Sequence, residues 1–278
     1  MAKPTPNVEP AIIPVINLEN YPTTTCIIQS GCLPTNSRQR EGLRTCRPIR
    51  SQSFPGVPAD IVVFDLALTL LTPARFLFST GVRVVDRSTE GSYDNLPRAD
   101  PSINAELIKV LRQLLASLLE TKKNYDDLQA RLRSQLALST AVKAIFNVMG
   151  ASHGIGHQLG PHVRRPRRDE LPYVMNYNWT HGGDGARGSL GCVASAFWDE
   201  PITIEARGHE NDKSSINPGD LVAAFVSKFG LPRGLGEFNI GCDQFGVLAE
   251  NSWTDPCTMV NPAKLDREKA IEILGMAA

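Results

Sequence analysis

The stretch that decides the fold is Gly150–Asn178, which reads GASHGIGHQLGPHVRRPRRDELPYVMNYN. Within it, His153 and His157 have the spacing that puts two imidazoles on one helix face, with Cβ atoms roughly 6 Å apart. Four glycines interleave with this pair: Gly150, Gly154, Gly156 and Gly160. Each lowers helix stability by about 1 kcal/mol relative to alanine, so they usually mark the close approach of another backbone or a flat ligand. The pattern suits a metal or planar cofactor; a loop, or an ordinary pair of structural histidines, is the alternative.

The composition limits the class of protein and its compartment. The 278 residues carry 29 basic and 29 acidic side chains, so no net field draws the chain towards nucleic acid or acidic membranes. No apolar run approaches the ~20 residues that span a bilayer, and the amino terminus, MAKPTPNVEP, lacks the apolar core of a signal peptide. Six cysteines without a C-x-x-C pair indicate free thiols in a reducing compartment. We therefore expect a cytoplasmic protein with no nucleic-acid or membrane partner.

Hydrophobic periodicity predicts helices over most of the chain after position 72. One apolar stripe repeats at helical spacing: Leu107, Leu111, Leu114 and Leu118. Asp126 and Asp127 are placed to stabilise the positive end of the next helix. His181–Gly191 is expected to be a glycine-rich loop. Arg164–Arg168 (RRPRR) has no interleaved aromatic residues, so a solvated loop is favoured there over a nucleic-acid site.

Two stretches before these helices are typical of buried strands. They are Ile12–Leu18, which Pro14 weakens, and Ile61–Asp65. The long segment between them is rich in Arg, Ser, Gly and Pro, and unstructured connections of that length are uncommon in compact domains. The pattern indicates a helical domain preceded by fragments of an α/β structure.

Three blocks of sequence resemble the iron-containing alcohol dehydrogenase family, nearest its maleylacetate reductase branch. The first is GASHGIGHQLG followed by LPYVMNYN, within Gly150–Asn178. The second is Asp65–Tyr93, DLALTLLTPARFLFSTGVRVVDRSTEGSY. The third, Phe229–Met276, contains FGLPRGLGEF and LAENSWTDPCTMVNP. Together the blocks cover most of residues 60–278.

The resemblance implies a mainly α fold in two parts. Residues 1–70 would be a partly irregular remnant of an α/β dinucleotide-binding domain, and residues 71–278 an all-helical dehydrogenase-like domain. The implied activity is NAD(P)-dependent oxidation of an alcohol or reduction of a carbonyl, with NAD or NADP as cofactor. The family's glycine-rich phosphate turn is missing here, since no glycine cluster follows a strand and opens a helix. Thr23 and Thr24 match the family's cofactor-contacting P-T-T loop, with an ordinary polar turn as the alternative.

The metal site implied by the resemblance is degenerate. The family holds iron or zinc with an Asp and a His four residues apart on one helix, and with two further histidines. Arg83 and Arg87 stand at the first two positions, His153 matches the third ligand, and the fourth falls in the shortened RRPRRDE segment. Guanidinium groups repel a cation, and a catalytic zinc site needs three protein ligands. We therefore expect that the protein binds neither iron nor zinc tightly.

The same arginines suggest a way to work without metal. Arg83 and Arg87 share one helix face, where they could stabilise an oxyanion or grip a substrate carboxylate. His157 matches the family histidine near the nicotinamide, and is the candidate proton donor or relay. The alternative is that both arginines form surface ion pairs with Asp86 and Glu90, which would contribute little.

These observations favour an alcohol dehydrogenase-like oxidoreductase acting on a small carbonyl or alcohol, or on a carboxylate bearing one. Two alternatives stay open. One is a helical scaffold without oxidoreductase activity that binds a small molecule, has a regulatory role, or is a pseudoenzyme; the other is a truncated gene model. Because a cleft face would be exposed if the neighbouring domain is reduced, we also expect a homo-oligomer or a partner covering that face.

Overall fold

A computed structural model describes residues 24–28, 61–93, 101–141, 149–159, 170–200, 216–231 and 234–278. The chain divides into two units, Met1–Leu71 and Thr72–Ala278. In the first unit, strand β1 (Thr24–Ile28) pairs antiparallel with strand β2 (Ile61–Asp65), and helix α2 (Leu66–Thr69) follows at once. The strand predicted at Ile61–Asp65 is confirmed, whereas the one predicted at 12–18 lies outside the described residues.

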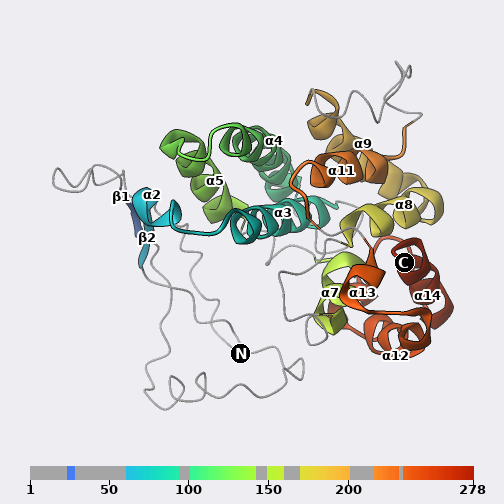
Figure 1. Ribbon diagram of the computed structural model, residues 1–278. Helices are drawn as coiled ribbons and strands as arrows, with labels where there is room; N and C mark the ends of the chain where they lie inside the picture. Colours follow the sequence, from blue (N-terminus) through green and yellow to red (C-terminus); the bar gives the residue numbers. More distant parts are fainter. Residues whose placement is uncertain are drawn as a thin grey trace, which may run out of the picture. The chain divides into compact units, whose positions relative to one another are not determined.

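The described part of the second unit is helical, so the expected mainly α fold is confirmed (Figure 1). Its helices are α3 (Ala74–Glu90), α4 (Pro101–Lys123), α5 (Leu128–Ala141), α7 (Ala151–Leu159), α8 (Leu171–His181), α9 (Gly183–Trp198), α11 (Pro218–Ser227), η3 (Leu235–Phe238), α12 (Cys242–Trp253), α13 (Pro256–Met259) and α14 (Arg267–Met276). Among the described helices, none combines the length and the apolar character that crossing a membrane requires.

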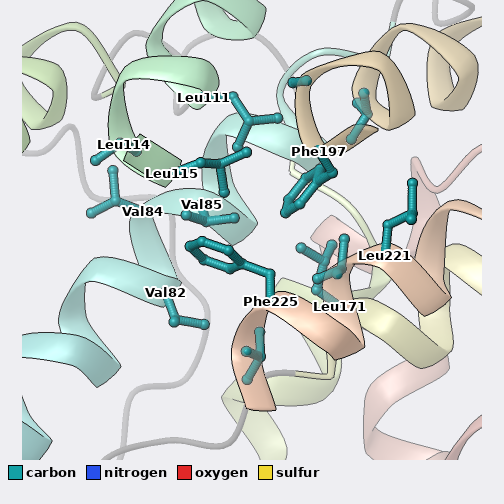
Figure 2. Close-up of a cluster of buried hydrophobic side chains, with 14 of the residues drawn as sticks. Val82, Val84, Val85, Leu111, Leu114, Leu115, Leu171, Phe197, Leu221 and Phe225 are labelled. Carbon is teal, nitrogen blue, oxygen red and sulfur yellow. The ribbon is translucent and has the colours of Figure 1, made fainter. Parts of the chain in front are cut away.

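The first hydrophobic core joins α3 and α4 to α9 and α11. The stripe predicted on α4 is confirmed, because all four of its leucines are buried. Figure 2 shows Leu111 and Leu115 of α4 near Val85 of α3 and Phe197 of α9. Phe225 of α11 completes this cluster, with its ring centroid 5.7 Å from that of Phe197. Burying an aliphatic side chain contributes about 1.5–3 kcal/mol, so this core holds the larger helices together.

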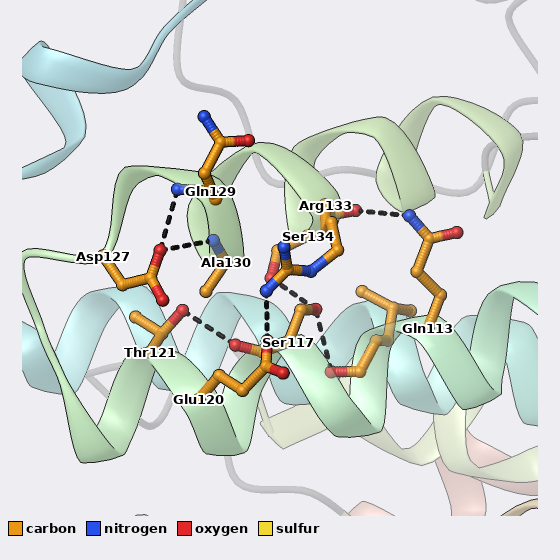
Figure 3. Close-up of polar contacts among 10 residues, drawn as sticks. Gln113, Ser117, Glu120, Thr121, Asp127, Gln129, Ala130, Arg133 and Ser134 are labelled. Carbon is orange, nitrogen blue, oxygen red and sulfur yellow. Dashed lines mark hydrogen bonds and ion pairs between the residues drawn. The ribbon is translucent and has the colours of Figure 1, made fainter.

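A polar seam joins α4 and α5 (Figure 3). The hydroxyls of Ser117 and Ser134 lie 2.8 Å apart across it.

The carboxylate of Asp127 accepts hydrogen bonds from the backbone N–H groups of Gln129 and Ala130, at 2.9 and 3.0 Å. The predicted role of Asp127 at the start of the next helix is therefore confirmed, because it satisfies two backbone donors that the helix cannot.

The second hydrophobic core lies beneath the His-bearing stretch. Ile155 and Leu159 of α7 are buried with Phe245 and Leu248 of α12 and Ile273 of α14. Figure 1 shows α7, α12, α13 and α14 gathered in one group. Phe245 and Leu248 both face the interior. This core fixes α7 against the carboxy-terminal helices.

The loop predicted at His181–Gly191 is wrong. Helix α8 runs through His181, and α9 begins at Gly183, whose φ of +72° lets the chain turn sharply between them. On α9 the buried residues Leu190, Val193 and Phe197 recur at helical spacing. Burial of this stripe outweighs the loss of about 1 kcal/mol for each glycine within the helix.

Candidate functional site

Helix α7 presents the two histidines on one face, as their spacing predicts. The rings of His153 and His157 meet edge to face, with centroids 4.5 Å apart and planes at 76°. Both residues are half-buried. The helix assignment excludes the loop interpretation of this stretch and leaves two adjacent imidazoles that solvent can reach.

The amino end of α7 is held by side chains that are distant in sequence. The Glu90 carboxylate accepts hydrogen bonds from the backbone N–H groups of Gly150, Ser152 and His153, at 3.0, 2.8 and 3.2 Å. The Ala151 N–H donates to the side-chain oxygen of Asn261 at 3.2 Å. The first N–H groups of a helix have no intrahelical acceptor, so these bonds supply what α7 lacks and fix its direction.

Glu90 is fully buried at the end of α3, with 0% of its surface exposed. Burial, together with the nearby charge of Asp86, raises the pKa of Glu90 well above its ordinary value, although the three N–H donors act in the opposite direction. The proposal that Glu90 belongs to a surface ion pair is therefore wrong. Its carboxyl group is a structural link between α3 and α7.

Two of the four glycines allow close packing of protein against α7. A Cβ at Gly154 would lie 2.1 Å from Thr258 Oγ1 and 3.1 Å from the Thr258 backbone nitrogen. A Cβ at Gly150 would lie 2.5 Å from Glu90 Oε1. A Cβ at Gly156 would meet nothing within 4 Å. The close approach predicted from the glycines is thus made at two positions by α13 and Glu90, without any ligand.

That close approach brings Asp255 to His157. Asp255 begins α13, where its Oδ1 accepts the Cys257 N–H at 2.9 Å. Its Oδ2 lies 3.0 Å from His157 Nδ1. The Asp255 side chain is 5% exposed and that of His157 is 37% exposed, so the pair runs from the interior to solvent. Burial acts to raise the pKa of Asp255, but the hydrogen bonds from His157 and Cys257 outweigh it and lower that pKa.

Cys257 lies beside the two histidines. One donor atom from each of His153, His157 and Cys257 lies within 4.8 Å of the other two. Burial, followed by the charges of Asp255 and Glu90, raises the pKa of the Cys257 thiol to about 12. The thiol is therefore protonated at neutral pH, which argues against a free thiolate nucleophile.

The two predicted arginines differ in their surroundings. Arg83 is exposed, whereas Arg87 is half-buried on the same face of α3. Burial and the neighbouring charge of Arg83 lower the pKa of Arg87, while Asp86 and Cys257 act to raise it. Arg87 lies in the last turn of α3, close to Glu90, which binds the amino end of α7. Arg83 lies one helical turn further away.

The metal and cofactor implied by the resemblance meet different residues here. At the α3 positions where an Asp and a His would hold iron, Arg83 and Arg87 offer no lone pair, so iron does not fit that ligand set. Thr24 begins β1 opposite Asp65, and Thr23 lies outside the described residues. Strand β2 runs directly into α2 without a glycine between them, so this junction does not form a phosphate-binding turn.

Four contributors to this site were not predicted as functional residues: Glu90, Asp255, Cys257 and Asn261. The sequence around Asp255 could have pointed to it, because Asp followed by Pro is typical of a helix start. A carboxylate that caps a helix is held in one orientation by its hydrogen bond to the backbone. Cys257 follows two residues later. Because about a hundred residues separate them from α7, the sequence alone does not predict their contact with its histidines.

Comparisons with known proteins agree with the resemblance seen in the sequence. The model of the Fe-containing alcohol dehydrogenase family, C-terminal, matches residues 78–278. "Dehydrogenase FUM7" of Gibberella moniliformis (strain M3125 / FGSC 7600) is 40% identical over 296 residues, covering 99% of this chain and 68% of that protein. "Dehydrogenase ALT3" of Alternaria alternata is 37% identical over 284 residues, covering 96% of this chain and 72% of that protein.

Solved structures share the fold at lower identity. Maleylacetate reductase from Rhizobium sp. strain MTP-10005 has a TM-score of 0.61 at 18% identity. A 1,3-propanediol oxidoreductase has a TM-score of 0.63 at 22% identity. Each match covers 77% of this chain but 55% of the solved chain, so the present chain spans little more than half of their length. The chain belongs to the iron-containing alcohol dehydrogenase family.

Proposed function

We propose that this chain is an oxidoreductase that interconverts a small alcohol and its carbonyl, with His157 as the proton carrier. The observation that carries the proposal is the 3.0 Å contact between His157 Nδ1 and Asp255 Oδ2. An imidazole oriented by a buried carboxylate is a recurring arrangement for general acid–base chemistry. The dehydrogenase names of its relatives favour the same class of reaction.

In the proposed reaction, each ring nitrogen of His157 has one role. When Nδ1–H donates to the Asp255 carboxylate, Nε2 is left to accept or return a proton. The lowered pKa of Asp255 keeps that carboxylate ionised and therefore able to accept. Nε2 would take the hydroxyl proton of an alcohol substrate during oxidation, and would protonate the carbonyl oxygen during reduction.

The arginines support a preference for an anionic substrate. Arg87 lies near the cluster and is half-buried, and a guanidinium in such a position is suited to a carboxylate or a developing oxyanion. Arg83, exposed on the same face, can add charge attraction from solvent. We propose that these groups do the electrostatic work that the metal does in metal-dependent relatives.

The proposal requires a hydride carrier, for which NAD or NADP is the candidate that the family suggests. When bound, that cofactor would supply or accept the hydride. The described residues do not contain the phosphate-binding turn such a cofactor normally uses, so binding is the first step to test. The proposal involves no iron at the α3 positions.

The first experiment is calorimetric titration of the purified, chelator-treated protein with NADH and with NADPH. Binding tighter than about 100 μM, roughly −5.5 kcal/mol, supports a cofactor-dependent oxidoreductase. No detectable binding by a protein that far-ultraviolet circular dichroism shows to be folded would overturn it. The search would then turn to small-molecule ligands of the α7 face.

Where turnover is found, His157→Gln should lower kcat by about 10²–10⁴-fold, the usual contribution of general acid–base catalysis. His181→Gln is the matched control, because His181 is an exposed histidine at the end of α8. Asp255→Asn should lower kcat and change its pH profile. Equal turnover in the His157 and His181 variants would remove His157 from the mechanism.

A further inference from the structure

Two imidazoles and one thiol meet where α7 and α13 pack together, and the geometry points to a metal site that shares only His153 with the family's ligand set. We propose that His153, His157 and Cys257 bind a soft divalent cation, for which Zn²⁺ is the best match. One donor atom from each lies within 4.8 Å of the other two. The set uses no residue of α3 and takes its sulfur ligand from α13. The proposal goes beyond the proposed function and does not depend on it.

The donor geometry needs only a small adjustment to accept the ion. Tetrahedral zinc, with bonds of about 2.0–2.3 Å, places its ligand atoms about 3.5 Å apart. Side-chain rotations that move the donors by about an ångström therefore close the present spacing. Two imidazoles and one thiolate make three protein ligands, which leaves the fourth position for water. All three residues are half-buried, so an ion can reach them from solvent.

A supporting shell is already in place behind His157. Asp255 Oδ2 occupies the Nδ1 side of the ring at 3.0 Å, so Nε2 is the nitrogen left to coordinate. A carboxylate behind a ligating histidine is the usual arrangement around zinc, where it orients the ring and makes it a better ligand. On the same helix, the His153 backbone N–H is held by Glu90 at 3.2 Å. The ring of His157 and the backbone of His153 are therefore held in place before an ion arrives.

The charges near the cluster are compatible with a bound cation. When the ion binds, the Cys257 thiol releases its proton to the buffer, and the resulting thiolate coordinates the metal. The two charges of the ion are then matched by the thiolate and by the Asp255 carboxylate. Arg87 opposes the ion, but its own charge is partly compensated by neighbouring Asp86. Arg83 is exposed, so solvent screens it.

Metal bound at this site would compete with the proposed proton transfer. A cation on Nε2 of His157 occupies the nitrogen proposed to carry the proton. Bound Zn²⁺ should therefore inhibit turnover rather than support it, which is opposite to the role of metal in metal-dependent relatives. The binding itself can be measured whether or not the protein shows turnover.

The test is titration of the chelator-treated, 278-residue chain with Co²⁺ under reducing conditions. We expect a thiolate-to-cobalt charge-transfer band in the near ultraviolet, and visible bands of the intensity typical of four-coordinate cobalt. Stoichiometric Zn²⁺ should abolish both sets of bands. A folded wild-type protein without the charge-transfer band would overturn the proposal.

Variants assign the ligands. Cys257→Ser should abolish the charge-transfer band, whereas Cys192→Ser and Cys242→Ser, which alter exposed cysteines, should leave it unchanged. Asp255→Asn should weaken Co²⁺ binding by about 10–100-fold, the usual effect of removing a carboxylate behind a ligand. His153→Gln should weaken binding, while His181→Gln should not. A band that survives Cys257→Ser would assign the cobalt to another thiol and overturn the proposal.

Discussion

The contact between α7 and α13 can be tested with two alanine substitutions on one helix. Gly154→Ala and Gly156→Ala each replace a glycine within α7, two residues apart. Each should gain about 1 kcal/mol of helix stability, because alanine loses less backbone entropy on folding than glycine does. They differ in what the added methyl group meets, so the comparison isolates packing.

At Gly156 the new Cβ meets nothing within 4 Å, so we expect stabilisation by the full amount of about 1 kcal/mol. At Gly154 it would lie 2.1 Å from Thr258 Oγ1, 3.1 Å from the Thr258 backbone nitrogen and 3.2 Å from Asp255 Oδ1. The threonine hydroxyl can rotate away, but the backbone nitrogen cannot, and Asp255 is held by its bond to His157.

Overpacking of this kind costs about 1–3 kcal/mol, so Gly154→Ala should be less stable than Gly156→Ala by a similar amount. Urea unfolding followed by circular dichroism measures the difference as a shift in midpoint at constant slope. Equal midpoints for the two variants would refute the α7–α13 packing described above, and with it the contact between His157 and Asp255.

Four further predictions concern other parts of the structure. At a pH below 4.5, Glu90→Gln should lower the free energy of unfolding by about 1–3 kcal/mol, because an amide N–H₂ would face a buried N–H of α7 that needs an acceptor. Burial raises the pKa of Glu90, so protonated Glu90 stabilises the folded state. This contribution is complete below the ordinary pKa of 4.5 and is lost as the pH rises through the raised pKa. The free energy of unfolding, measured against pH, should show this fall in the wild type and lack it in Glu90→Gln. Asp127→Ala should lower the free energy of unfolding by about 1 kcal/mol, because α5 loses its cap. Asp126→Ala alters an exposed neighbour and should change that free energy by less than about 0.5 kcal/mol. A comparable loss in both variants would contradict the capping role of Asp127. Sedimentation at micromolar concentration should reveal self-association, since Val247, Met259 and Val260 expose apolar surface beside the site, and a monomer would contradict this expectation.

Local periodicity predicted the frame of the site well. The four-residue spacing of His153 and His157 placed both rings on one face of α7, and the leucine repeat of α4 identified its buried side. These signals succeed because each concerns neighbours along one helix. The loop expected at His181–Gly191 failed for the opposite reason, because contacts with other helices decide whether a glycine-rich segment is helical.

The chemistry of the site depends on contacts that periodicity does not encode. The sequence shows Asp255 and Glu90 but not their hydrogen-bond partners. Those partners, the His157 ring and the amino end of α7, are known only from the packing of α13 and α3 against α7. Glycine spacing was informative yet ambiguous, since a missing Cβ admits a protein backbone as readily as a ligand. The predicted roles of Arg83 and Arg87 stay predictions.

The clamp on the amino end of α7 also bears on the order in which the protein can fold. The bonds from Gly150 to Glu90 and from Ala151 to Asn261 close separations of 60 and 110 residues, and the pair of His157 and Asp255 closes 98. Contacts so distant along the chain form late, because loop closure must precede any gain from them. During synthesis, α7 therefore emerges before two of the three partners that orient its histidines. Its amides should gain protection from hydrogen exchange only after α13 and the segment around Asn261 have docked, so the face with both histidines is completed by residues about a hundred positions further along the chain.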